Sequence, residues 1–253
     1  MIFIKSSKEI AKMREAGKIL ASVYMELKKR IRPGITTMQI NDFVEKYLKH
    51  HRAIPEQKGY HGFPYAICAS SNDEICHGFP SRRRVEEGDV LKIDMVVNYN
   101  GWLADSARTF LVGEVSEEAK KLVQVTKKAM FLGIEQAISG NRLGDVGCAI
   151  QTYVEGLGYS VVRDFTGHGI GRLIHEDPQV DHVGKKGRGQ RITEGMVFTV
   201  EPMINQGDYH TKIDANGWTA RTIDGKLSAQ FEHTIAITEN GTVILTDLEG
   251  LDD

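Results

Sequence analysis

The sequence predicts a mixed α/β or α+β fold, and three observations support this expectation. Amphipathic segments with apolar residues at three- and four-residue spacing recur along the chain, as α-helices require. Short apolar segments bounded by turn residues lie between them, and these predict β-strands. The segment EEGDVLKIDM returns later as TEGMVFTVEP, which suggests two structurally related halves, with helices and strands interleaved.

Helical spacing of apolar residues indicates four helices. Pro33-Gly34 ends the first of them. Thr37 is the expected N-cap of the second, since threonine often caps a helix that begins with an apolar stripe. The turn-rich link SGNRLGD separates the third from the fourth. The expected helices cover residues 7–30, 37–50, 117–139 and 143–156.

The expected strands are short and apolar. The link Asn98-Tyr99-Asn100-Gly101 carries an Asn-Gly pair between two apolar runs, which predicts a β-hairpin. The expected strands cover residues 66–70, 90–99, 102–111, 196–200 and 230–238.

The two similar segments, residues 86–95 and 193–202, form what we call the internal echo. Superimposing them pairs Glu87 with Glu194, Gly88 with Gly195, and Asp94 with Glu201. Each copy is a Glu-Gly turn that leads into an apolar strand ending in a carboxylate. Because Glu-Gly before a strand is common turn chemistry, the echo alone leaves a chance match open. A true duplication would aim one carboxylate from each half at a shared centre.

The composition is that of an ordinary globular protein. The chain has 253 residues, 41% of them apolar and 26% charged, enough to bury a full core. A net charge of −2 offers no positive excess for nucleic acid or anionic lipid, and no stretch approaches the roughly 20 apolar residues of a membrane span. We expect residues 1–253 to form a single catalytic domain. We also expect the protein to be cytoplasmic, without membrane association and without direct nucleic-acid binding.

The cysteines argue against two further classes of protein. Cys68, Cys76 and Cys148 form an odd, sparse set without short paired spacing. Such a set favours neither a disulfide framework nor a zinc site made of thiolates. The N-terminal residues MIFIKSSKEI become charged too early for a signal-peptide core.

Four carboxylates stand in apolar surroundings. Asp94 and Asp105 lie within the expected hairpin, Glu201 ends a strand before Pro202, and Glu232 interrupts an apolar run. Burying a carboxylate is costly unless a cation or strong hydrogen bonds compensate it. Exposed strand ends would also accommodate the two aspartates, so position alone leaves that alternative open.

A histidine stands apart in the segment GHGIGRLIHE. Glycines flank His168, and they leave space beside its ring, while neutral imidazole is a common metal ligand. His175 follows in the same segment, and alone it would be a weak signal. His233 would point away from Glu232 in a strand, so we leave it out of the site.

The donor count favours two metal ions. Four carboxylates and one imidazole form a hard, oxygen-rich set unlike a structural zinc site. One divalent ion leaves two negative charges uncompensated, whereas two ions neutralise all four. A pair of ions roughly 3.5–4 Å apart can generate a nucleophile from water and polarise a carbonyl group. This chemistry suits a hydrolase that acts at a carbonyl group, such as that of a peptide bond.

The segments ICHG, KIDMVVNYNGWLADSART, GHGIGRLIHEDP, FTVEPM and SAQFEHT resemble the signature blocks of type I methionine aminopeptidases, in that family's order and over nearly the whole chain. The resemblance implies the short bacterial form and the pita-bread fold, with two pseudo-symmetric halves and a curved antiparallel sheet covered by helices. It implies removal of the initiator methionine from nascent chains near the ribosome, with a preference for a small second residue, by a monomer.

The resemblance also implies roles for individual residues. Two divalent ions, drawn from Mn, Fe, Co or Zn, would be held by five residues, with Asp94 on one ion, Asp105 and Glu232 bridging, and His168 and Glu201 on the other. Glu201 would also shuttle a proton. His77 and His175 would contact the nitrogen and the carbonyl oxygen of the scissile amide. The residues implied for the methionine pocket are Tyr60, Phe63, Cys68, Phe165 and Trp218.

Two details of the resemblance call for comment. Relatives often carry tyrosine where this chain has Phe63, so a polar contact there is in doubt while the apolar fit is not. The family also implies a loop for one monovalent cation, built from backbone groups near Asn72, Glu74 and Ser228.

Other functions remain alternatives. An Xaa-Pro aminopeptidase or dipeptidase has the same fold, but it usually carries a large N-terminal domain, and only about 93 residues precede Asp94. Type II methionine enzymes carry an insertion between the last two glutamates, whereas Glu201 and Glu232 lie 31 residues apart. A non-catalytic binding protein, or a metal-free creatinase, would lack part of the five-residue ligand set.

Overall fold

The computed structural model describes residues 1–251 of the chain. Its helices are α1 (Ser7–Arg30), α2 (Thr37–His50), α3 (Glu117–Gln136) and α4 (Leu143–Gly156), with a short 3₁₀ helix at Tyr60–Gly62. Its strands are β1 (Ile54–Pro55), β2 (Cys68–Ser71), β3 (Glu74–Cys76), β4 (Val90–Tyr99), β5 (Trp102–Leu111), β6 (Ser160–Val161), β7 (Gly167–Gly169), β8 (Glu176–Val180), β9 (Val197–Val200), β10 (Met203–Asn205), β11 (Thr211–Ile213), β12 (Ala220–Thr222), β13 (Ser228–Gln230), β14 (His233–Thr238) and β15 (Gly241–Ile244).

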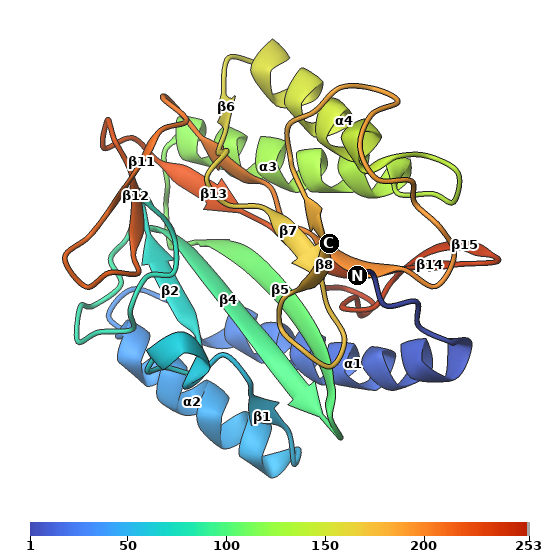
Figure 1. The fold of residues 1–253 in the computed structure, drawn as a ribbon. Helices are drawn as coiled ribbons and strands as arrows, with labels where there is room; N and C mark the ends of the chain where they lie inside the picture. Colours follow the sequence, from blue (N-terminus) through green and yellow to red (C-terminus); the bar gives the residue numbers. More distant parts are fainter. Residues whose placement is uncertain (252–253) are drawn as a thin grey trace.

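The chain is arranged as two facing halves. Helices α1 and α2 lie on one side of the strands and α3 and α4 on the opposite side (Figure 1). In the first half β4 pairs with β1, β2 and β5, and in the second β9 pairs with β7 and β14. Every strand pair in the described part of the chain is antiparallel. The predicted mixed class is therefore confirmed, in its α+β form.

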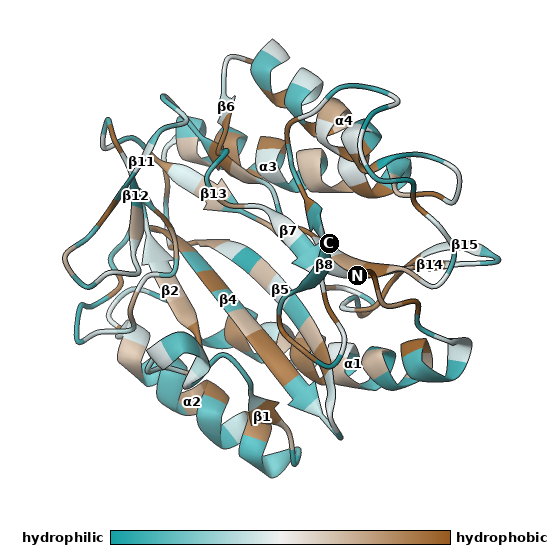
Figure 2. Cartoon of the chain, in the orientation of Figure 1, coloured by the Kyte–Doolittle hydropathy of each residue, from teal (hydrophilic) through white to brown (hydrophobic). Residues whose placement is uncertain are grey.

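Each half has its own core. One cluster joins the apolar faces of α1 and α2 to β2, β4 and β5, and another joins α3 and α4 to β9, β13 and β14. Figure 2 shows the corresponding pattern, with hydrophobic colour over much of β4 and alternating colours along α2. The apolar faces that the sequence predicted for these helices thus pack against the strands, as the helical period requires.

The expected helix bounds hold for α1, α2 and α4. Helix α3 ends at Gln136 instead of residue 139, because Ala137 leaves the helical conformation at ψ 61°. The N-cap of α2 is Thr36 and not Thr37, as its hydroxyl accepts the N–H of Gln39 at 3.1 Å. The hydroxyl of Thr37 donates instead to the carbonyl of Ser81.

The expected strands 90–99 and 102–111 form as a hairpin with the predicted bounds. Tyr99 pairs with Trp102, and Asn100 and Gly101 between them take positive φ values of 53° and 77°. Both φ signs belong to a type I′ turn, the form that the Asn-Gly pair favours. The expected strands 66–70 and 196–200 form as β2 and β9, shifted by one or two residues.

The expected strand 230–238 was wrong as a single element, because it divides into β13 and β14. Between them the N–H of Glu232 donates to the carbonyl of Ala107 on β5, at 3.0 Å. The carbonyl of Glu232 accepts the hydroxyl of Ser106, at 2.6 Å. The backbone thus bonds to the opposite half here, and this irregularity brings Glu232 against β5.

The internal echo corresponds to a repeated structural feature. Gly88 has φ 91° and donates its N–H to the carbonyl of Val112, while Gly195 has φ 81° and donates to Ile237, each at 2.8 Å. Positive φ at both positions explains why glycine recurs there. The first turn leads into β4, which carries Asp94, and the second leads into β9, which Glu201 directly follows, so the two halves are pseudo-symmetric.

Candidate metal centre and active-site cavity

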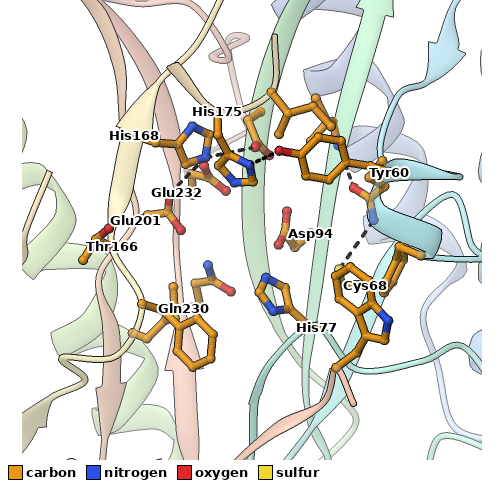
Figure 3. A pocket seen from close by; sticks show the side chains of 18 residues that line it. Tyr60, Cys68, His77, Asp94, Thr166, His168, His175, Glu201, Gln230 and Glu232 are labelled. Carbon is orange, nitrogen blue, oxygen red and sulfur yellow. Dashed lines mark hydrogen bonds and ion pairs between the residues drawn. The ribbon is translucent and has the colours of Figure 1, made fainter. Parts of the chain in front are cut away.

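One cavity receives side chains from both halves of the molecule. It is lined by all twelve residues that the sequence suggested for the site, and Figure 3 shows carboxylates and imidazoles pointing into it. They come from distant parts of the chain, so the fold is what brings them together. The twelve residues are Tyr60, Phe63, Cys68, His77, Asp94, Asp105, Phe165, His168, His175, Glu201, Trp218 and Glu232.

The β4–β5 hairpin supplies two of the carboxylates. Asp94 lies opposite Ala107, and Val96 lies opposite Asp105. Because residues two apart in a strand share a face, and opposite residues share it too, Asp94 and Asp105 project from the same face. Thr234 holds Asp105 in place, since its hydroxyl accepts the N–H of Asp105 at 2.9 Å and donates to the carbonyl at 2.8 Å.

The second half supplies the imidazole and a third carboxylate. His168 Nδ1 lies 3.0 Å from the carbonyl oxygen of Gly169, so Nε2 is left for the cavity. His168 Nε2 lies 3.6 Å from Glu201 Oε1 and 3.7 Å from Asp105 Oδ2. The Thr199 hydroxyl donates to Glu201 Oε1 at 2.7 Å and accepts the N–H of His168 at 2.9 Å.

Three of the five proposed ligands form the tightest group. One ligand atom from each of Asp105, His168 and Glu232 lies within 4.8 Å of the other two. Among the described residues, buried Asp105 Oδ1 and Glu232 Oε1 have no hydrogen-bond partner. A buried carboxylate oxygen needs a compensating group, because leaving it unpaired is costly. Oxygen-rich ligation with one imidazole suits a divalent transition metal, so these residues fit such ions.

The electrostatics of the cluster agree with its need for cations. Burial raises the pKa of Asp94 to about 7 and that of Glu201 to about 8. Burial and the neighbouring carboxylates raise the pKa of Asp105 and of Glu232 well above the usual range. Burial also lowers the pKa of His168 to about 3, so its ring is neutral and able to ligate. Four ionised carboxylates therefore require added positive charge.

Two histidines line the cavity beside the carboxylates. His77 has φ 55°, and burial lowers its pKa to about 4. Its ring meets Phe165 edge-on, with centroids 5.4 Å apart. The ring of His175 lies 4.3 Å from that of His168, and burial lowers its pKa as well. Both rings are thus neutral near pH 7 and offer one N–H donor each.

Aromatic rings form the apolar part of the wall. Phe63 is 3% exposed and packs edge-on against Trp218, with centroids 5.2 Å apart. Cys68 lies opposite Asp94 in the β2–β4 pairing, so the cavity wall passes directly from thiol to carboxylate. The Gln57 amide nitrogen lies 3.5 Å from the Cys68 sulfur. An apolar slot therefore adjoins the carboxylate cluster.

Sequence reasoning missed several residues that shape the site. Thr199 lies on β9, two residues before Glu201, which directly follows that strand, so the two-residue period could have revealed it. His182 accepts the backbone N–H of Glu201 at Nε2, 3.0 Å away, and burial lowers its pKa to about 3. No pattern in the sequence links His182 to Glu201. Gln57 and Gln230 line the cavity too.

The side chain of Lys92 lies among the backbone groups implied for a monovalent cation. Nζ of Lys92, which is 1% exposed, lies 2.8 Å from the carbonyl oxygen of Asn72 and 2.9 Å from that of Ser228. The lysine therefore occupies the space between the two carbonyl groups. The Glu74 side chain, for its part, accepts the N–H of Ser71 and pairs with Arg221.

The described helices include none whose length and apolar character would let it cross a membrane.

The chain matches the model of metallopeptidase family M24 over residues 11–239. A methionine aminopeptidase of Clostridium acetobutylicum is 49% identical over 97% of this chain and 99% of its own length.

Solved structures show the same relationship. A methionine aminopeptidase of Rickettsia prowazekii superimposes with a TM-score of 0.96 at 46% identity, covering 98% of this chain and 100% of its own. An Xaa-Pro dipeptidase of Bacillus anthracis shares the pita-bread fold, with a TM-score of 0.76 at 24% identity, over 97% of this chain and 62% of its own. The chain belongs to metallopeptidase family M24, and within that family it groups with the methionine aminopeptidases.

Proposed function

We propose that this chain is a metallo-exopeptidase that removes the N-terminal methionine from polypeptides, with preference for a small second residue. The observation that carries the proposal is the adjacency, in one cavity, of a carboxylate–imidazole cluster and an aromatic slot. Its relatives named methionine aminopeptidase match over nearly the full chain. Because the ligand residues come from both halves, we propose that the whole chain acts as one catalytic domain.

The metal assignment follows from the donor set. We propose that two divalent ions, drawn from Mn, Fe, Co or Zn, are held by Asp94 on one side, by His168 and Glu201 on the other, and by Asp105 and Glu232 between them. The unpaired oxygens Asp105 Oδ1 and Glu232 Oε1 support the bridging positions. Ions bound there would lower the pKa of a water molecule and polarise the substrate carbonyl.

The protein groups around the cluster then divide the remaining tasks. Glu201 Oε1 is engaged by the Thr199 hydroxyl, which leaves Oε2 to take a proton from the attacking water and pass it to the leaving amine. In this proposal His175 donates a hydrogen bond to the carbonyl oxygen, where negative charge develops. His77 lies between the aromatic wall and the carboxylates (Figure 3), which suits contact with the amide nitrogen.

The aromatic slot would hold the methionine side chain. Phe63 and Trp218 provide faces for an unbranched thioether, which makes favourable contacts with aromatic rings. The wall has no tyrosine hydroxyl at Phe63, so shape and apolar contact determine selectivity there. Tyr60, Cys68 and Phe165 complete the proposed slot.

The cellular setting is also a proposal. Cys68, Cys76 and Cys148 are free thiols, which favours a reducing compartment such as the cytoplasm. There a monomer would act on nascent chains near the ribosome, as the family resemblance implies.

A peptide panel tests the activity. The purified protein is loaded with Mn(II), Co(II), Fe(II) or Zn(II) and given peptides that begin Met-Gly, Met-Ala or Xaa-Pro, and the released amino acids are quantified. We expect methionine to be released from the first two far faster than any residue is released before proline. A clear preference for Xaa-Pro peptides would overturn the proposal.

Variants of the cluster test the metal assignment. Asp94→Asn and Glu232→Ala should remain folded and lose hydrolysis, because each removes a proposed ligand. Glu135→Gln is the matched control, since Glu135 is an exposed carboxylate on α3, and it should retain full activity. Substantial turnover by either ligand variant, at equal metal occupancy, contradicts the dinuclear assignment.

A further inference from the structure

Lys92 is a buried lysine that the proposed reaction does not use. It lies on β4, two residues before Asp94, and is 1% exposed. Its Nζ donates to the carbonyl oxygens of Asn72, at 2.8 Å, and of Ser228, at 2.9 Å. No carboxylate of the described chain lies within ion-pair distance of it, so its direct partners are backbone carbonyl groups. The more distant carboxylates of Glu74, Asp73 and Asp89 favour its charged form.

The two carbonyl groups belong to different halves of the molecule. Asn72 lies in the turn between β2 and β3, whereas Ser228 begins β13. The halves already meet here through the backbone, because the N–H of Ser228 donates to the carbonyl of Asn72 at 3.0 Å. The oxygen of Asn72 thus accepts two hydrogen bonds, which fills both of its lone pairs.

The coordination resembles that of a bound alkali ion. Rings of backbone carbonyl groups coordinate alkali ions in the selectivity filters of K⁺ channels, and a lysine ammonium is a compact single charge with several donors. Val90 contributes a third carbonyl oxygen, 3.5 Å from Nζ. An alkali ion placed between Asn72 and Ser228 would need the position that Nζ fills.

We propose that Lys92 replaces a bound monovalent cation in this chain, so that an internal ammonium group, and no alkali ion, joins the two halves at Asn72 and Ser228. Removing the ammonium group while leaving space should leave inward-facing carbonyl groups without a partner, which is costly in the interior. That space should then take K⁺ or Na⁺ from solution.

Thermal unfolding in different salts tests this replacement. Wild type, Lys92→Ala and Lys92→Met are unfolded in KCl, NaCl or choline chloride at equal ionic strength, with the divalent metal removed by chelation. Alanine opens the space for an ion, whereas methionine fills it with an apolar chain of similar length. The choline salt controls for electrostatic screening, because it matches the ionic strength but its cation is too large to enter the space between the carbonyl groups of Asn72 and Ser228.

The three proteins should behave differently. Wild type should unfold at the same temperature in all three salts. Lys92→Ala should unfold several degrees lower in choline chloride and regain part of that loss in KCl or NaCl, saturably. Lys92→Met should lose stability without any regain. If Lys92→Ala fails to fold in every salt, Lys92→Asn replaces it, because its short amide also leaves space and offers an oxygen ligand.

Two results would overturn the proposal. The first is a saturable stabilisation of wild type by K⁺ or Na⁺ relative to choline, which would mean that a cation binds despite Lys92. The second is a space-opening variant whose stability does not distinguish alkali ions from choline. Because unfolding is the readout, a failure here would leave the peptide panel, and so the proposed activity, unaffected.

Discussion

The hydroxyl of Tyr60 lies 2.8 Å from Nδ1 of His175, and the two ring centroids are 5.3 Å apart. A tyrosine hydroxyl that donates to Nδ1 fixes the neutral tautomer that carries its proton on Nε2. Burial lowers the pKa of His175, which favours that neutral form. Tyr60 therefore does more than line the cavity: it orients the group proposed to donate to the substrate carbonyl.

Tyr60→Phe should lower kcat more than it raises KM, because it keeps the ring and removes only the bond that orients His175. Loss of one hydrogen bond of about 1–2 kcal/mol corresponds to a roughly 5- to 30-fold fall. Tyr65→Phe is the control, since Tyr65 packs on Phe63 and Phe79. In a His175→Ala background the Tyr60 change should have no further effect, and an additive loss would show that Tyr60 acts independently.

Divalent metal should stabilise the fold as well as support activity. At an ion concentration about 100 times the dissociation constant, binding contributes about 2.7 kcal/mol, or a rise of about 5–10 °C in the unfolding temperature of a chain of this size. Differential scanning calorimetry with Mn(II) and with a chelator measures this rise.

Asp105→Asn should abolish most of that rise, because it removes one proposed bridge. In chelator the same variant should be at least as stable as wild type, since it relieves repulsion among buried carboxylates. Glu135→Gln should keep the full rise. An Asp105→Asn protein that metal still stabilises as strongly as wild type would exclude Asp105 from the metal site.

The sequence predicted the regular elements well where one physical rule dominates. The apolar stripe of α1 and the Asn-Gly turn of the β4–β5 hairpin each act through local periodicity or local backbone preference, and both appeared with the expected bounds. The candidate metal ligands could be identified from the sequence because carboxylates in apolar segments, and a histidine between glycines, are rare. The internal echo then indicated that they come from two halves.

The remainder depends on contacts between distant segments. The expected strand is interrupted at Glu232 because the backbone of Glu232 forms hydrogen bonds with Ala107 and Ser106 on β5. No local sequence pattern predicts these contacts. Likewise, nothing near Lys92 in the sequence indicates that its ammonium group meets Ser228. Thr36 and Thr37 are equally good caps by type, and only the backbone conformation decides between them.

Asp89 should make stability depend on acid pH. Burial raises the pKa of Asp89, but bonds from the Arg83 guanidinium, the N–H of Glu86 and the Asn72 amide outweigh burial and hold it below its ordinary value of 3.8. A lowered folded-state pKa means that ionised Asp89 stabilises the fold fully above the unfolded-state pKa. That contribution is lost as the pH falls from about 4 through the folded-state pKa.

Asp89→Asn should therefore reduce the free energy of unfolding by about 1–2 kcal/mol near pH 7, and its deficit against wild type should shrink below about pH 4. Urea unfolding of both proteins across this range measures the deficit. Glu135→Gln should show no deficit at any pH. A deficit that stays constant down to the lowest pH at which both proteins fold would assign the effect to packing and not to charge.

Gly17 and Gly156 should respond oppositely to the same substitution. A Cβ at Gly17, in α1, would lie 2.0 Å from the carbonyl oxygen of Leu245, which is backbone and cannot move aside, whereas a Cβ at Gly156 meets nothing within 4 Å. Alanine favours the helix over glycine by about 0.5–1 kcal/mol at an unhindered position. Gly156→Ala should thus leave the unfolding free energy unchanged or slightly raised. Gly17→Ala should lower it by more than that helix preference, because α1 must move away from the segment after β15, and equal effects at both sites would refute this close approach.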